Sequence, residues 1–124
     1  MTKIMLIDDD NELRATLADL LGASGYDVQS AASGDEAIEM LKSGLPDALV
    51  VDLMMPHKDG IMTIQEILRS YPRAKVIAIS GGPGGNPSWL PIAKSVGALA
   101  VLKKPFTNER LQESIKEVLA NPWR

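Results

Sequence analysis

Four short runs of continuously apolar residues constrain this chain more than any other feature. An apolar run with no polar alternation is typical of a β-strand that is covered on both faces, as in a parallel sheet. The runs are Ile4–Ile7, Leu49–Val51, Val76–Ile79 and Leu99–Leu102. A fifth candidate strand, Tyr26–Ala31, mixes polar and apolar residues and therefore suits a sheet edge.

Segments with a helical period separate these runs. Leucine, isoleucine and valine recur at helical spacing between the strands, and the spacing predicts helices near residues 13–21, 33–41, 61–68, 88–96 and 111–119. Gly22, Gly44 and Gly97 lie where three of these helices should end. The order βα repeated five times predicts a doubly wound α/β fold, with a five-stranded parallel sheet in the order 2-1-3-4-5 and five flanking helices. We expect one domain over residues 1–124 and no second domain.

Composition excludes several classes of function. With 13 basic and 16 acidic residues, the net charge of −3 argues against direct binding of nucleic acid. The chain has no cysteine and a single histidine, His57, which excludes thiol chemistry and a zinc site of several histidines. No apolar run approaches the roughly 20 residues of a membrane helix, and the start does not read as a signal peptide. We expect a cytoplasmic protein that does not contact a membrane.

Polar residues gather where the predicted strands end. Asp8–Asp10 follow the first strand, Asp52 the third, Ser80 the fourth, and Lys103 and Lys104 the fifth. Ligands of open parallel sheets bind at these carboxyl ends, and strands one and three are neighbours in the predicted order. Clustered carboxylates need raised pKa values or a cation, and an all-oxygen set suits Mg²⁺. A lysine and a hydroxyl suit a phosphoryl group, and Asp52 can serve as its nucleophile.

Each of these residues also has an ordinary structural explanation. Asp10 or Asn11 can be the N-cap of the following helix. Ser80 alone would be a loop serine, and the two lysines alone would be solvated surface charges. The agreement of four strand ends favours a functional site.

The combined motifs resemble the receiver domain of two-component response regulators, across essentially the whole chain. The residues that carry the resemblance are Ile7-Asp8-Asp9-Asp10, Asp52-Leu53-Met54-Met55-Pro56, Asp59-Gly60, Ser80 and Lys104-Pro105-Phe106. The resemblance implies a flavodoxin-like fold and a phosphoacceptor at Asp52, supplied by a histidine kinase or a histidine phosphotransfer protein. It also implies that Mg²⁺ is held by Asp8, Asp9, Asp52 and the backbone carbonyl of Met54. Ser80 would be the switch hydroxyl, and Lys104 the family's lysine, before a commonly cis proline.

Such a protein would signal rather than act as an enzyme on other substrates, and would switch contacts with a downstream protein partner that the sequence does not identify. Two features depart from the family pattern. Val101 occupies the position where an aromatic switch residue is common, and a long glycine-rich segment, residues 81–87, follows Ser80. We interpret that segment as a switch loop, because it lacks the Gly-Lys-Ser/Thr ending of a phosphate-binding loop.

Three alternatives stay open at this point. A flavin or nucleotide carrier of the same fold is disfavoured because Asp8–Asp10 would repel a phosphate. A phosphatase with an aspartyl nucleophile usually has a second acid two positions later, where this chain has Met54. A degenerate receiver that serves only as a scaffold is disfavoured by the intact acids and Lys104.

Overall fold

A five-stranded parallel sheet forms the centre of the molecule in the computed structural model, which describes residues 1–54, 60–81 and 89–122. The strands are β1 (Lys3–Ile7), β2 (Asp27–Ala31), β3 (Ala48–Asp52), β4 (Val76–Gly81) and β5 (Ala100–Lys104). The helices are α1 (Asn11–Ala23), α2 (Gly34–Leu41), α3 (Gly60–Ser70), α4 (Trp89–Ser95) and α5 (Asn108–Ala120). The strand order β2-β1-β3-β4-β5 confirms the predicted topology, with β2 at an edge.

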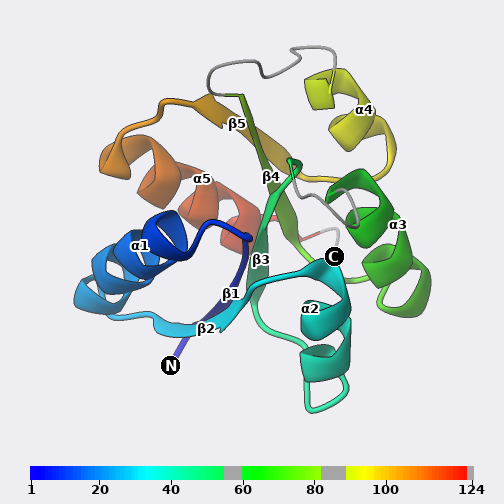
Figure 1. Cartoon of the computed structure of the whole chain (residues 1–124), viewed down its shortest axis with the longest axis horizontal. Helices are drawn as coiled ribbons and strands as arrows, with labels where there is room; N and C mark the ends of the chain where they lie inside the picture. The colour runs from blue at the N-terminus through cyan, green and yellow to red at the C-terminus, as the bar shows by residue number, and fades with distance from the viewer. Residues whose placement is uncertain (55–59, 82–88, 123–124) are drawn as a thin grey trace.

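Helices cover both faces of the sheet, with α1 and α5 on one side and α2, α3 and α4 on the other (Figure 1). Side chains of each strand alternate between the two layers. Met5 and Ile7 pack toward α2, α3 and α4, whereas Ile4 and Leu6 pack toward α1 and α5. All four are almost fully buried, which explains why the run carries no polar residue.

One predicted helix end is wrong. Helix α1 continues through Gly22 to Ala23, and Gly25 adopts the positive φ of 96° that ends the turn. Gly44 and Gly97 follow α2 and α4 with φ values of 143° and 118°, as predicted. Within the described residues, no helix is both long and apolar enough to cross a membrane. His57 and most of the glycine-rich segment after Ser80 lie outside those residues.

Candidate functional site

The turn after β1 directs its three aspartates to different tasks. The Asp8 N–H donates to the carbonyl of Ala31, 3.1 Å away, which extends the pairing of β1 with β2. Asp10 is the N-cap of α1, because its carboxylate accepts from the Leu13 N–H at 3.1 Å. The structural explanation therefore holds for Asp10, and Asp8 and Asp9 are left for the site.

Asp52 is the last residue of β3, and only 4% of its surface is exposed. The Met54 N–H donates to its Oδ1 at 3.0 Å, which fixes the carboxylate. Helix α3 begins close by at Gly60, where a Cβ atom would lie 2.4 Å from the Asp52 carbonyl oxygen. Glycine at position 60 therefore lets the helix start directly against the end of β3. The sequence marks this glycine as part of the Asp59-Gly60 motif but does not show that it lies against the Asp52 backbone.

Three carboxylates converge where β1 and β3 end. One oxygen each of Asp8, Asp9 and Asp52 lies within 4.8 Å of the others; Asp8 and Asp52 are buried and Asp9 is exposed. Burial, together with the negative charge of Asp52, raises the pKa of Asp8 to about 6 from an ordinary value of 3.8. The hydrogen bond from the Asp10 N–H, 2.9 Å long, opposes this rise without cancelling it. The crevice therefore favours a bound positive charge, either a proton on Asp8 or a cation.

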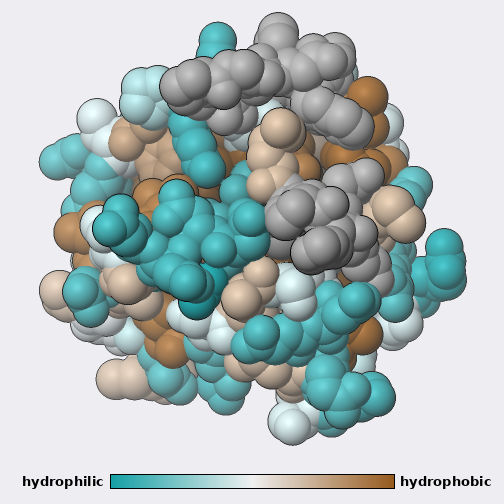
Figure 2. Space-filling view, viewed as in Figure 1, coloured by the Kyte–Doolittle hydropathy of each residue, from teal (hydrophilic) through white to brown (hydrophobic). Residues whose placement is uncertain are grey.

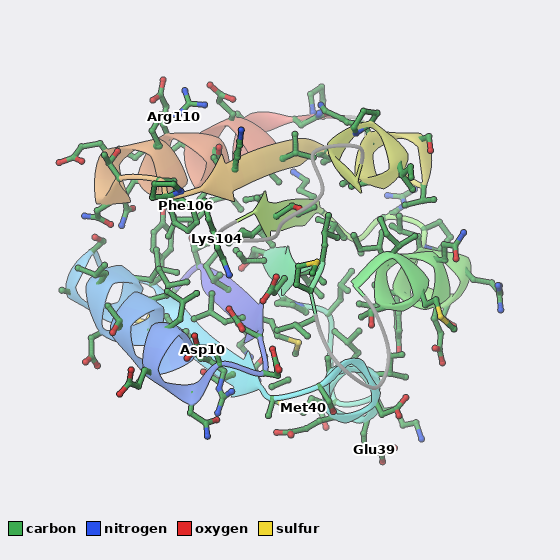
Figure 3. All side chains as sticks on the ribbon, turned by 45° about the horizontal axis from the view of Figure 1, so that its top comes forward. Asp10, Glu39, Met40, Lys104, Phe106 and Arg110 are labelled. Atoms are coloured by element: carbon green, nitrogen blue, oxygen red, sulfur yellow. The ribbon has the colours of Figure 1, made fainter. Side chains whose placement is uncertain are left out.

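Lys104 supplies the opposite wall of the crevice. Its Nζ lies 3.5 Å from Asp52 Oδ2, and Figure 3 shows the side chain directed from β5 toward the middle of the sheet. Lys103 is exposed, so Lys104 is the lysine that the fold brings to Asp52. The Lys104-Pro105 peptide is cis, as the resemblance implies.

Ser80 lies in β4, next to β3 in the sheet, and is 1% exposed. Within the described residues its Oγ has no hydrogen-bond partner. A buried hydroxyl without a partner costs roughly 1–3 kcal/mol, so this oxygen is available to a ligand group that reaches it. Met54 is 46% exposed, and the part of its carbonyl in metal binding stays a prediction. Val101 is half-buried and packs against the core layer of α2, α3 and α4.

The surface around the acids is hydrophilic. In the space-filling view, hydrophilic residues gather over the turn between β1 and α1 and the first part of that helix (Figure 2). Exposed residues of this segment are Asp9, Asp10, Asn11 and Glu12. A separate cavity of about 580 Å³ lies between α1 and α5. Its lining includes Lys104 but none of the three clustered aspartates. Its position separates it from the carboxylates, so we place the chemistry in the hydrophilic crevice.

The donor set fits Mg²⁺. Asp8, Asp9 and Asp52 offer only oxygen atoms, which hard cations prefer. Burial, and to a smaller extent the charge of Asp52, raises the pKa of Asp8, and a divalent ion would stabilise its charged form. The structure thus brings together the three acids and Lys104 that the sequence singled out. The role of each residue stays a prediction.

The fold and the acids at its strand ends define a doubly wound α/β protein with its crevice at the point where strand order reverses. The sequence model of the response regulator receiver domain family matches residues 4–116 of this chain. The chain belongs to this family of two-component signalling domains.

Relatives differ in how much of their length the chain covers. It is 33% identical over 117 residues to the chemotaxis protein CheY of Thermotoga maritima, covering 94% of this chain and 96% of that protein. It is 36% identical over 119 residues to the transcriptional regulatory protein CpxR of Klebsiella pneumoniae. This match covers 96% of this chain but only 50% of that regulator. A receiver domain structure from Clostridium thermocellum superimposes with a TM-score of 0.89 at 27% identity, over 96% of this chain and 94% of that one. The chain therefore spans nearly all of that CheY but only about half of that CpxR.

Proposed function

We propose that this receiver domain accepts a phosphoryl group on Asp52, in a Mg²⁺-dependent transfer from a phosphohistidine of a histidine kinase or histidine phosphotransfer protein. One observation carries the proposal: oxygens of Asp8, Asp9 and Asp52 lie within 4.8 Å of one another, with Lys104 Nζ 3.5 Å from Asp52. A buried carboxylate beside two acids and a lysine suits a nucleophile whose product gains negative charge.

Asp8, Asp9, Asp52 and the Met54 carbonyl would hold the ion. Bound there, Mg²⁺ would neutralise charge on the carboxylates and on the oxygens of the transferred group. Asp8 and Asp9 come from the turn after β1, so both sides of the crevice contribute ligands.

The chain's own residues position the reacting carboxylate. The Met54 N–H holds Asp52 Oδ1, and the ammonium of Lys104 faces Oδ2. An oxygen of Asp52 attacks phosphorus, the O–P bond forms as the N–P bond of the donor breaks, and the bond electrons stay on the donor nitrogen. Lys104 then pairs with an oxygen of the phosphoryl group, and the Ser80 hydroxyl, which has no partner among the described residues, donates to another.

The output of this reaction is a change of protein contacts. A phosphoryl group adds charge and hydrogen-bond acceptors, which favour one of two conformations. The domain acts on its own carboxylate rather than as an enzyme on other substrates. It passes the signal on by contact with a downstream protein partner, not by direct binding of nucleic acid. A cytoplasmic location belongs to the same proposal.

The test is phosphorylation by a small acyl phosphate in the presence of MgCl₂, followed by intact mass spectrometry. The wild-type chain should gain one base-labile phosphoryl group, and Asp52→Asn should gain none. Asp27→Asn, at an exposed acid of β2, is the matched control and should be modified like the wild type. A modified Asp52→Asn protein, or a wild type modified equally in EDTA, would contradict the proposal.

A further inference from the structure

Arg14, near the start of α1, contacts the turn between β1 and α1 that carries Asp8, Asp9 and Asp10. Its Nη1 donates to the Asp8 carbonyl oxygen at 2.6 Å, and its Nη2 donates to Asn11 Oδ1 at 2.7 Å. The side chain is half-buried, and together with Asp8 and Asp52 it lines a small cavity beneath the crevice. A planar guanidinium with two fixed hydrogen bonds is a rigid link between a helix and a strand end.

The Asp8 carbonyl lies just beyond the last residue of β1, where the pairing with β2 stops at Ala31. Arg14 is the side chain that satisfies this carbonyl among the described residues. The Asp8 N–H and Oδ1 are held by Ala31 and by the Asp10 N–H. With Arg14 in place, both backbone groups and the side chain of Asp8 are fixed.

Asp9 depends on this support more than its neighbours do. Its carboxylate is exposed, and within the described part of the chain no hydrogen bond or ion pair holds it. The direction of the Asp9 side chain is therefore set by the backbone of the turn. That backbone is fixed on one side by Arg14 and on the other by Asp10, whose carbonyl accepts from the Arg14 N–H at 2.9 Å.

We propose that Arg14 is a positioning residue for the metal site: its guanidinium fixes the Asp8 carbonyl and thereby aims Asp8 and Asp9 at the cation. The inference rests on the proposed Mg²⁺-dependent function and adds a residue that does not touch the ion. Groups that orient metal ligands typically change metal affinity roughly 10- to 100-fold when they are removed.

The sign of the effect separates positioning from simple electrostatics. Arg14 is a cation close to a cation site, so if only its charge mattered, its removal would strengthen Mg²⁺ binding. If it positions the turn, its removal weakens binding although a repulsive charge is lost. Arg14→Met keeps most of the apolar stem and removes the guanidinium, and Arg14→Lys keeps the charge but not the two-pronged geometry.

The experiment is a titration of the full chain with MgCl₂, followed by amide NMR signals of the turn after β1, with a urea unfolding curve for each variant. We expect Kd for Mg²⁺ to rise at least about 10-fold in Arg14→Met. Arg14→Lys should fall between that variant and the wild type. Arg69→Met removes a cation from the last turn of α3 and should bind like the wild type.

The outcomes distinguish the two proposals. A wild type that does not bind Mg²⁺ would overturn the proposed function and this inference with it. A wild type that binds, together with an equal or tighter Kd in Arg14→Met, would overturn the role of Arg14 alone. If Arg14→Met proves too unstable to titrate, Arg14→Lys decides the question: a wild-type Kd there would refute the positioning role.

Discussion

Replacing Asp8 by asparagine should stabilise the metal-free protein at neutral pH. The carboxylate of Asp8 is buried beside Asp52, and its pKa is raised to about 6, so at neutral pH the folded protein carries a charge that its surroundings disfavour. Asparagine has nearly the same shape and can still accept the hydrogen bond from the Asp10 N–H through its Oδ1. The substitution therefore removes the charge and keeps the turn.

The size of the effect follows from the pKa of Asp8 and its ordinary value. A rise from 3.8 to about 6 disfavours the charged form by about 3 kcal/mol, since a pKa difference of one is worth roughly 1.4 kcal/mol. The folded pKa lies above the unfolded one, so the contribution of this proton to stability is complete below about 3.8 and is lost as the pH rises from there through about 6. The Asp8→Asn variant avoids this loss, so it should be more stable than the wild type by about 1–3 kcal/mol at about pH 7.5.

Urea unfolding in EDTA, followed by circular dichroism between about pH 4 and pH 7.5, measures this difference. The gap between Asp8→Asn and the wild type should be small near pH 4, should widen as the pH rises from about 4 to about 6, and should level off above that. Adding MgCl₂ at about 100 times Kd should stabilise the wild type by roughly 2.7 kcal/mol and the variant far less. The difference in stability between the two proteins should therefore shrink or change sign. Asp19→Asn, at an exposed acid of α1, controls for the loss of one negative charge.

Two results would refute this reasoning. In one, Asp8→Asn is no more stable than the wild type at neutral pH without metal. In the other, the stability gap is the same at acidic and at neutral pH, which would mean that Asp8 does not titrate in this range.

Three further predictions concern the same site. Asp9→Ala should weaken Mg²⁺ binding at least about 10-fold in an NMR titration while the urea midpoint barely moves, because this carboxylate is exposed and is a proposed ligand of the ion. Gly60→Ala should cost about 1–3 kcal/mol in urea unfolding, because the new methyl group would lie 2.4 Å from the backbone oxygen of Asp52. Lys104→Met should raise the pKa of Asp8 further, measured by carboxyl ¹³C NMR, since the Lys104 charge lowers that pKa.

Controls and contrary results for these three are direct. An unchanged Mg²⁺ titration in Asp9→Ala would put the ion elsewhere. Gly22→Ala is the matched glycine control, because a methyl group there meets nothing within 4 Å and a helical position gains roughly 0.5–1 kcal/mol from alanine. A Gly60→Ala protein as stable as the wild type, or a lowered pKa of Asp8 in Lys104→Met, would contradict the geometry.

The sequence predicted most of the fold because its strongest signal is physical. A run such as Ile4–Ile7 must be covered on both faces, and in the structure Met5 and Leu6 pack into opposite layers. The end of α1 was predicted wrongly at Gly22, because a glycine near the end of a helical pattern is a common helix terminator, whereas the residue with a positive φ is Gly25. The fully buried Leu21 and the Ser24 cap belong to a helix that continues past Gly22, which is a result of packing rather than of local sequence.

Strand order also predicted which residues meet at the crevice, because the carboxyl ends of neighbouring parallel strands share one edge. The clustered carboxylates predicted raised pKa values or a cation, but not that the pKa of Asp8 is the one raised, because this depends on how deeply each carboxylate is buried. The contact of Arg14 was missed for a simpler reason. An arginine on an amphipathic helix is usually solvated, and nothing in the local sequence marks this one as bound to a strand carbonyl.

Asp52, Ser80 and Lys104 lie on strands of the sheet, whereas the outer faces of the helices are exposed to solvent. The receiver domain structure from Clostridium thermocellum superimposes with a TM-score of 0.89 at only 27% identity, so this arrangement of sheet and helices tolerates wide changes of sequence. Positions on the outer helix faces can therefore change without moving Asp52, Ser80 or Lys104.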